Sequence, residues 1–223
     1  MNTMSITLDP IALPREVVVA GWTGRDAASV RAHIEELAAI GVQPPSQTPL
    51  FYLVSSDRLT QRDVVTVVGR NTSGEAEPVL VWQSDGICIG IGSDHTDRDS
   101  ERYGVAISKQ LCPKVVGRDF WFLRDVARRW DQLILRSFRE SDGSMSLYQE
   151  GPLSAILHPD ELIERYGRGG YGRLETGSVM FCGTVPTLTG VARADALTVE
   201  LHDPATGSVL RHRYCVQELP VVV

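Results

Sequence analysis

Acidic and basic side chains with the chemistry of a metal-assisted site are concentrated between positions 75 and 109. Glu75 and Glu77 are two residues apart, so on a β-strand both carboxylates point to the same face of the sheet. Asp94 follows at the distance of one hairpin, and three carboxylates that converge on one point form an oxygen-ligand site for a divalent cation. Arg98 and Lys109 come next, and their charges suit an anionic, oxygen-rich substrate.

A histidine and a glutamate farther upstream have the spacing of a general base and its orienting carboxylate. His33 and Glu36 are three residues apart, which places both side chains on one face of a helix. A positioned histidine can take a proton from water while the carboxylate fixes its ring. The same pair could equally be two exposed side chains on a solvated helix, and the spacing alone does not separate the two interpretations.

Hydrophobic periodicity predicts the elements that position these residues. It predicts a strand over 16–20, a helix over 26–40 and a hairpin over 78–91. A strand over 105–111 is expected to carry Lys109. A helix over 120–136 is favoured by an apolar stripe of Phe122, Val126, Trp130 and Leu133. A short helix is expected from Pro159, and further strands at 50–54, 64–69, 147–151, 179–182, 197–202 and 211–216.

Strands outnumber helices in this interpretation, so the expected fold class is α+β and β-rich, one mixed β body decorated by a few helices. At 223 residues the chain is expected to form a single domain over 1–223. Within it, 1–60 is expected to be an N-terminal region with a lid-type helix, and 61–223 the β-rich catalytic body.

Five motifs occur in the order found in the fumarylacetoacetate hydrolase family, and the chain resembles that family from about Gly21 to its C-terminus. The first is the pair His33 and Glu36, followed by a proline-containing stretch that ends at Phe51. The others are Glu75-x-Glu77, the segment Ser93-Asp94-His95-Thr96-Asp97-Arg98-Asp99, the lysine Lys109, and the late segment 176–186 that contains Gly183-Thr184-Val185-Pro186.

The resemblance implies a fold, a cofactor and site residues. It implies a β-rich rolled fold and a homodimer. It also implies Mg²⁺ or Mn²⁺, with Ca²⁺ possible in crystals, held by Glu75, Glu77 and Asp94. His33 and Glu36 would be catalytic, and the substrate contacts would be made by Arg98, Glu101, Lys109 and Thr184, of which Arg98 and Lys109 are also catalytic.

Four positions depart from the family pattern. Cys112 stands where an aspartate usually follows the lysine, and Glu101 stands where many members carry glutamine. Asp97 replaces a small residue before the arginine, and Val185 interrupts Gly-Thr-Pro. The metal ligands are retained while the substrate-side residues differ, so the family's substrate does not transfer to this chain.

The expected function is divalent-metal-dependent hydrolysis of a carbon–carbon bond in a small 1,3-dicarbonyl or acylpyruvate-type keto acid. The cation would stabilise the enolate that such cleavage leaves, and His33 would activate water. The same site could instead serve a β-keto acid decarboxylase, a tautomerase or a hydratase. An alternative of another class is a non-catalytic protein that binds a metal or a small acid.

Composition limits the partners and the location. A formal net charge of −6, spread along the chain, argues against nucleic acid or an acidic membrane as a partner. The partner that the family resemblance implies is a small anionic keto acid. The chain shows neither a signal-peptide pattern nor an apolar run long enough for a membrane span, so a cytoplasmic location is expected. The four cysteines are widely separated, which favours reduced thiols over zinc or disulfides.

Overall fold

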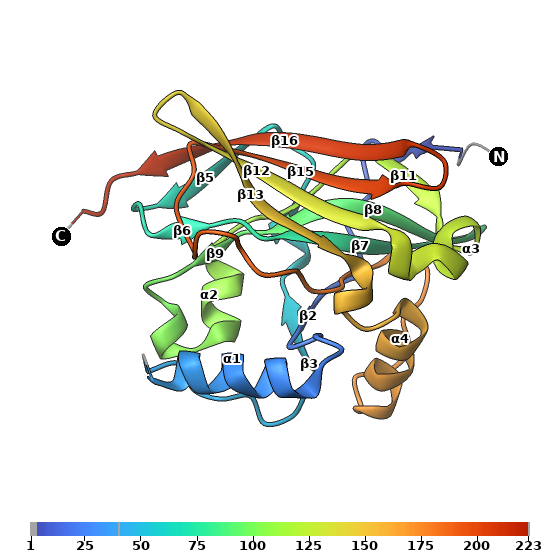
Figure 1. Ribbon diagram of the computed structural model, residues 1–223, viewed down its shortest axis with the longest axis horizontal. Coiled ribbons are helices and arrows are strands. Elements are labelled where there is room, and N and C mark those ends of the chain that lie inside the picture. The colour runs from blue at the N-terminus through green and yellow to red at the C-terminus, as the bar shows by residue number, and fades with distance from the viewer. Residues whose placement is uncertain (1–3, 40, 223) are drawn as a thin grey trace.

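The computed structural model describes residues 4–39 and 41–222. Within them, a nine-stranded sheet runs through the middle of the molecule and carries the central hairpin (Figure 1). Its main path joins, in order, β1 (Ile6–Thr7), β11 (Asp119–Phe122), β8 (Gly86–Asp94), β7 (Ala76–Gln83), β14 (Ser178–Phe181), β2 (Glu16–Gly21) and β3 (Leu50–Val54). Beside this path, β10 (Lys114–Val116) pairs with β8 and also with β4 (Leu59–Thr60).

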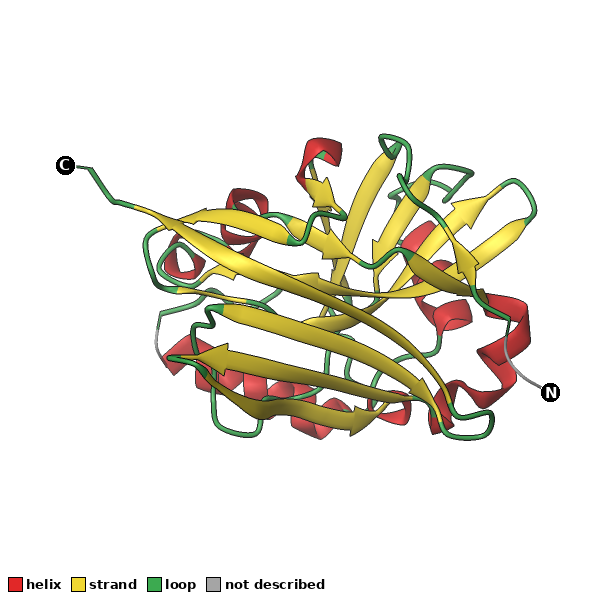
Figure 2. Cartoon of the chain, turned by 90° about the horizontal axis from the view of Figure 1, so that it is seen from above, coloured by secondary structure: helices red, strands yellow, loops and turns green. Residues whose placement is uncertain are grey.

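A second sheet covers one face of the first and is formed by five strands of the described chain (Figures 1 and 2). Its order is β13 (Ser144–Pro152), β12 (Ile134–Ser141), β15 (Ala196–Asp203), β16 (Ser208–Leu219) and β5 (Val64–Val68). A short pair of strands, β6 (Thr72–Ser73) and β9 (Thr96–Asp97), lies next to the end of β8. The β-rich α+β class predicted from the sequence is confirmed.

The α-helices found in the described residues are α1 (Ala27–Ala39), α2 (Val105–Leu111), α3 (Leu123–Val126) and α4 (Pro159–Arg168). Helices α1, α2 and α4 lie on the side of the nine-stranded sheet that faces away from the second sheet, and α3 lies at one end of the sheets (Figure 1). Short 3₁₀ helices are η1 (Ser56–Arg58), η2 (Glu101–Tyr103), η3 (Ala127–Gln132) and η4 (Leu153–Ala155).

The central hairpin is buried on both faces, which explains its nearly continuous apolar sequence. Alternate residues of β7 point to opposite sides: Leu80 packs into the core shared with the second sheet, and Val79 and Val81 pack into the core on the other side. β7 and β8 are therefore fixed in register by both cores, and side chains at their ends are held rigidly.

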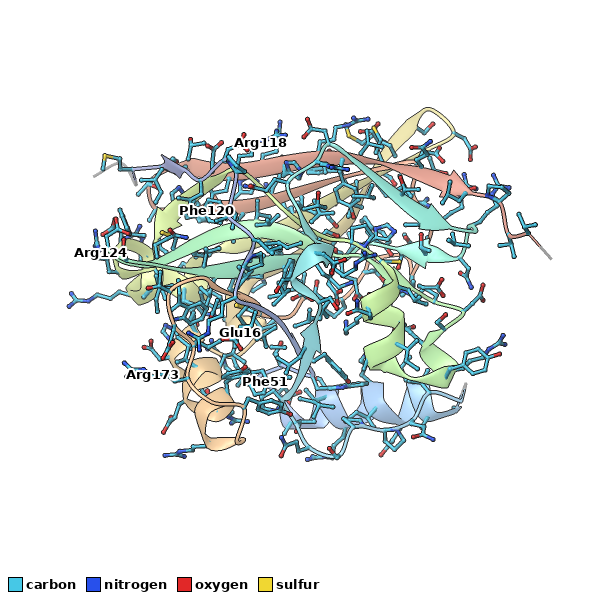
Figure 3. The ribbon with its side chains drawn as sticks, turned by 180° about the vertical axis from the view of Figure 1, so that it is seen from behind. Glu16, Phe51, Arg118, Phe120, Arg124 and Arg173 are labelled. Atoms are coloured by element: carbon cyan, nitrogen blue, oxygen red, sulfur yellow. The ribbon has the colours of Figure 1, made fainter. Side chains whose placement is uncertain are left out.

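The N-terminal region contributes strands to the same sheet as the rest of the chain. β2 pairs in parallel with β14, and β3 pairs with β2. Glu16 of β2 accepts a hydrogen bond from the Tyr166 hydroxyl of α4 at 2.9 Å. Phe51 of β3, part of the family-like motif, packs edge-on against the Tyr166 ring with centroids 5.2 Å apart (Figure 3). Phe51 is thus a packing residue that ties β3 to α4.

Helix α1 confirms the predicted helix, but it packs loosely. Asp26 caps its first turn by accepting hydrogen bonds from the Ala28 and Ser29 amides. None of the side chains from Ala27 to Ala39 is buried. Ile40, the last residue of the expected apolar stripe, lies outside the described residues. α1 is therefore held mainly by its ends and by partial contacts.

The strand predicted over 105–111 is wrong: these residues form α2. The alternation of Val105, Ile107 and Lys109 resembled a strand, and seven residues are too few for length to decide. In the helix Lys109 is buried, while Ile107 is 53% exposed. The helix places the Lys109 ammonium beside a buried carboxylate, and that ion pair outweighs the exposure of apolar side chains.

The helix predicted over 120–136 is also wrong in its extent. Phe120 and Trp121 belong to β11 and are both fully buried, so consecutive residues point to opposite faces of the sheet, as in a strand buried on both sides. Helical turns run only from Leu123 to Gln132, and β12 begins at Ile134.

Candidate functional site

The β7–β8 hairpin brings the three predicted carboxylates to one end of the sheet. Glu77 lies in β7 opposite Gly92 of β8, and Asp94 ends β8. Glu75 immediately precedes β7, and its carbonyl accepts a hydrogen bond from the Asp94 amide at 3.0 Å. The backbone register therefore fixes the spacing of the three side chains.

Two lysines share the carboxylate of Asp94, which is completely buried. Lys109 Nζ donates a hydrogen bond to one oxygen, and Lys114 Nζ lies 3.0 Å from the other. Burial raises the pKa of Asp94, but the two ammonium charges outweigh it and hold that pKa below its usual range. Asp94 is therefore ionised.

Lys109 lies in the field of all three carboxylates. Burial lowers its pKa, but the charges of Asp94, Glu75 and Glu77 more than compensate and raise that pKa above its usual range. Its ammonium also lies 5.8 Å from the ring centroid of Tyr52. All three negative charges act on the Lys109 ammonium, which donates a hydrogen bond to one of them, Asp94.

Glu77 is more deeply buried than Glu75, with 3% of its surface exposed. Its Oε2 accepts a hydrogen bond from the Gly183 amide at 2.7 Å. Burial, and next the negative charge of Asp94, raise the pKa of Glu77 well above its usual range. A further positive charge near Glu77 would favour its ionised form.

Gly183 cannot carry a side chain without disturbing this contact. Its φ is +98°, and a Cβ would lie 1.8 Å from Thr23 Oγ1. Gly183→Ala is expected to lower the free energy of unfolding by about 2–5 kcal/mol. Two destabilising effects are summed in this value: the left-handed backbone conformation of the alanine and the overpacking of its Cβ against Thr23. The control Gly190→Ala, at φ +80° with no atom within 4 Å of its Cβ, should cost only about 1–2 kcal/mol. Chemical denaturation measures both, and equal losses would contradict the crowding argument.

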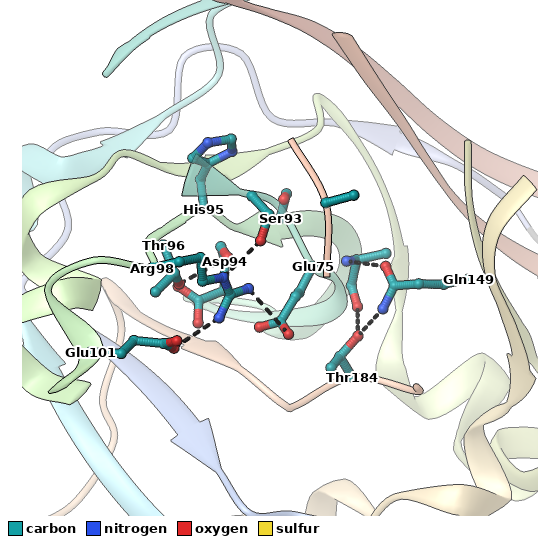
Figure 4. Close-up of polar contacts among 12 residues, drawn as sticks. Glu75, Ser93, Asp94, His95, Thr96, Arg98, Glu101, Gln149 and Thr184 are labelled. Carbon is teal, nitrogen blue, oxygen red and sulfur yellow. Dashed lines mark hydrogen bonds and ion pairs between the residues drawn. The ribbon is translucent and has the colours of Figure 1, made fainter. Parts of the chain in front are cut away.

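Arg98 is locked between acidic and hydroxyl partners (Figure 4). Its Nε donates to Ser73 Oγ at 2.7 Å, and Nη1 donates to Glu101 Oε1 at 2.8 Å. Nη2 lies 3.3 Å from Glu75 Oε1. The structure thus brings Arg98 and Glu101 to the carboxylate cluster as the sequence suggested.

Thr184 belongs to a buried hydrogen-bond network centred on Gln149 (Figure 4). Thr184 Oγ1 donates to the Ala76 carbonyl at 2.6 Å and accepts from Gln149 Nε2 at 2.8 Å. Gln149 Oε1 also accepts from the Ala76 amide at 2.9 Å. The Thr184 hydroxyl proton is therefore used within the chain, so a contact with a substrate carboxylate requires this hydroxyl to rotate.

A cleft of about 930 Å³ lies between α1 and the loop after β14. Its lining includes four predicted site residues, namely His33, Glu36, Glu75 and Thr184. His33 Nδ1 lies 3.6 Å from Glu36 Oε2, and these side chains are 61% and 77% exposed. The structure therefore brings the histidine pair to the same cleft as Glu75, one of the three carboxylates.

Lys114 and Gln149 were missed by the sequence interpretation. Lys114 has no exposed surface and also donates hydrogen bonds to the His95 and Cys112 carbonyls. A lysine at the start of the apolar run Lys114–Val116 was the available signal, because a buried ammonium needs a partner. No comparable signal marks Gln149, whose contacts come from distant strands.

His95, from the family-like segment 93–99, is a packing residue. It is 1% exposed, with Nδ1 3.0 Å from the Tyr214 hydroxyl and Nε2 2.9 Å from Thr72 Oγ1. Burial is the main cause that lowers its pKa to about 3, so the ring is neutral.

The donor set has the chemistry of a divalent-cation site, since its three carboxylates lie at one end of the β7–β8 hairpin and oxygen ligands of this kind suit Mg²⁺ and Mn²⁺. In this structure Lys109 donates a hydrogen bond to one of the three, Asp94. Arg98 Nη2 is buried and makes no hydrogen bond within the described protein. As placed, no three His, Cys, Asp or Glu side chains of residues 4–39 and 41–222 are arranged to hold a metal. The ligand set therefore stays a prediction.

The fold of the chain is similar to the folds of several solved structures. It is similar to Cg1458 (18% identity, TM-score 0.68, covering 93% of this chain and 77% of that one) and to the apo form of 2-keto-3-deoxy-D-arabinonate dehydratase (18%, 0.64, 93% and 74%). It is also similar to 4-oxalocrotonate decarboxylase from Pseudomonas putida G7 (14%, 0.59, 91% and 77%). At these identities the likeness shows a shared fold, and the β-rich fold that the family resemblance implied is confirmed.

The chain belongs to the family described as "Protein of unknown function (DUF2848)", whose model matches residues 20–214. A comparison with curated protein sequences finds no match. Within the described residues, none of the helices combines the length and the apolar character needed to cross a membrane.

Proposed function

We propose that the protein is a divalent-metal-dependent enzyme that hydrolyses a carbon–carbon bond in a small 1,3-dicarbonyl or acylpyruvate-type keto acid. The observation that carries the proposal is the placement of Glu75, Glu77 and Asp94 at one end of the β7–β8 hairpin, where Glu75 lines the same cleft as His33. Two structural relatives support the general part of this proposal, namely a metal-dependent enzyme that acts on a small keto acid. One is 2-keto-3-deoxy-D-arabinonate dehydratase complexed with magnesium and 2,5-dioxopentanoate, and the other is 4-oxalocrotonate decarboxylase complexed with magnesium and adipate.

Glu75, Glu77 and Asp94 would hold Mg²⁺ or Mn²⁺. When bound, the cation supplies Lewis-acid stabilisation for the negative charge that develops on the substrate oxygens. Lys114 keeps one oxygen of Asp94 oriented, since its ammonium is fixed by two backbone carbonyls. The protein thus supplies a rigid set of acidic oxygens rather than a flexible one.

The remaining residues would move protons and bind the substrate. His33, oriented by Glu36, takes a proton from a water molecule, whose oxygen attacks the carbonyl carbon. The carbon–carbon bond breaks, its electron pair forms the enolate, and the proton on His33 returns to that carbon. Arg98, held by Glu101, and Lys109 bind the substrate carboxylate or the developing oxyanion.

The same residues support other reactions of keto acids if water does not attack the carbonyl carbon. A β-keto acid would lose carbon dioxide and leave an enolate, proton transfer alone would give a tautomerase, and addition of water to a carbon–carbon double bond would give a hydratase. The structural relatives include a dehydratase and a decarboxylase, so the experiment below must also distinguish these reactions from hydrolysis. A passive binding protein is disfavoured because His33 and Glu36 line the cleft with Glu75.

The test is a panel of acylpyruvates, oxaloacetate and 2-oxo-diacids, with Mg²⁺ or Mn²⁺, followed by loss of enol absorbance. We expect metal-dependent loss with at least one acylpyruvate and two acid products by mass spectrometry. Loss accompanied by carbon dioxide release would instead identify a decarboxylase. Unchanged absorbance across the panel with both metals would contradict the proposal.

We expect two copies of the chain to form a homodimer. A single chain leaves apolar residues exposed near its C-terminus, with Val221 64% and Val222 88% exposed, while Val223 lies outside the described residues. Light scattering at micromolar concentration should give twice the chain mass, and Val222→Glu should weaken the dimer while Val209→Glu, on β16, should not. A monomeric mass for the unmodified protein would contradict this expectation.

A further inference from the structure

The cleft beside the carboxylate cluster is much larger than a small keto acid requires. Its volume of about 930 Å³ lies near the upper end of the range of roughly 300–1,000 Å³ found for pockets that bury drug-sized ligands. Glu75 and Thr184 mark its polar end. Beyond them the walls are largely apolar and include Trp22, Val30, Ala155, Val185, Pro186 and Val191.

The charges on the cleft walls are unfavourable for a second carboxylate. Arg25 is the only arginine or lysine among the described lining residues, and Asp131 holds it in a bidentate pair at 2.9 and 2.7 Å. Arg25 Nε also donates to the Ile156 carbonyl at 3.0 Å. The other charged residues beyond the polar end include two acids, Asp26 and Glu36. A carboxylate there would lose hydration and meet negative charge.

Trp22 provides a rigid aromatic wall within this cleft. Its φ is +61°, which is rare for a bulky residue and is retained only where the surroundings impose it. The indole Nε1 donates to the Tyr52 hydroxyl at 3.2 Å, and the Trp22 and His33 rings lie 5.7 Å apart. The strain and the hydrogen bond together hold an apolar surface next to the proposed base.

We infer that the substrate is a keto acid with a single carboxylate and an uncharged, largely apolar tail, which lies along Trp22 and the apolar walls. This inference rests on the proposed function for the position of the carboxylate, which binds near Lys109 and Arg98. Glu75, whose Oε1 lies 3.3 Å from Arg98 Nη2, lines the cleft together with the apolar walls, so the cleft offers a place for each end of such a molecule.

Binding of two inert probes tests the inference without requiring turnover. 2-Oxohexanoate and 2-oxoadipate have the same number of carbons and the same keto-acid head, but end in a methyl group and a carboxylate. Titration calorimetry with Mg²⁺ present should show 2-oxohexanoate binding at least about tenfold more tightly. Equal or tighter binding of 2-oxoadipate would overturn the inference, and so would failure of both probes to bind at millimolar concentration.

A charge added to the wall supplies a second test with a matched control. Val191 lines the cleft and is 55% exposed, whereas Val209 on β16 is 42% exposed and is not among the residues that line it. Val191→Arg should shift the ratio of the two dissociation constants about tenfold towards 2-oxoadipate, and Val209→Arg should leave it unchanged. An unchanged ratio in Val191→Arg, with the fold intact by circular dichroism, would place the tail elsewhere.

Failure of this inference and failure of the proposed function can be distinguished. If 2-oxohexanoate binds preferentially but no acylpyruvate with an apolar tail is cleaved, the tail assignment stands and the hydrolase proposal fails. If an acylpyruvate that carries a second carboxylate is cleaved faster than its methyl-ended counterpart, the hydrolase proposal stands and the tail assignment fails.

Discussion

Glu77→Gln is expected to reduce Mg²⁺ or Mn²⁺ affinity by about 10²-fold or more without loss of stability. Glutamine has nearly the same volume and keeps an oxygen that can accept the Gly183 amide. The substitution removes a buried carboxylate next to Asp94, so the folded state loses like-charge repulsion and desolvation cost. Titration calorimetry measures the affinity, and chemical denaturation without metal measures the stability.

Glu101→Gln is the control for this experiment. Glu101 is an acid that binds Arg98 but is not in the proposed ligand set, so its loss should change cation affinity only severalfold. If Glu77→Gln binds the cation as tightly as the unmodified protein, Glu77 is not a ligand. Loss of stability in Glu77→Gln would show that the Gly183 contact requires the carboxylate.

His33→Ala is expected to lower kcat by about 10²–10⁴-fold while cation affinity stays nearly unchanged. The imidazole is the proposed base, and it lines the cleft without being part of the carboxylate cluster. Because α1 buries none of its side chains, truncation of His33 should leave the global stability almost unaltered. Steady-state kinetics on a substrate from the panel, together with calorimetry, separates the two effects.

Two further variants sharpen the interpretation of His33. Arg31→Ala changes an exposed residue of α1 that is not among those lining the cleft, and it should retain full activity. Glu75→Ala should lose both cation binding and turnover, since a site of three carboxylates does not tolerate removal of one. Turnover near the unmodified level in His33→Ala would remove His33 from the mechanism and favour a decarboxylase that needs only the metal, Arg98 and Lys109.

The parts of the site that lie on one hairpin could be predicted, because strand geometry determines them locally. Glu77 and Asp94 follow from the alternation and the turn of a β7–β8 hairpin, and Glu75 from its two-residue spacing. Asp94 was expected to face a cation, but its two lysine partners come from α2 and β10. A local pattern does not specify which distant charges neutralise a buried acid.

The incorrect predictions for 105–111 and 120–136, and the failure to find Gln149, all arise because tertiary contacts determine the structure of these residues. Segment 105–111 has too few residues for its pattern to distinguish a strand from a helix, and its buried ion pair decides the outcome. In the sequence, Phe120 and Trp121 extend the apolar pattern of the predicted helix. In the structure they pair with β1 and β8 and therefore form a strand. Gln149 carries no signal, since its partners Ala76 and Thr184 are brought to it only by the folded sheets.

The loose packing of α1 has a consequence for how proteins with this architecture can diverge. Because its side chains are not part of either core, substitutions along α1 change the wall of the cleft at little cost to folding. Glu77 and Asp94, in contrast, lie on strands that are buried along most of their length. Substrate preference and metal chemistry are thus carried by segments under different constraints, and the first can change while the second is retained.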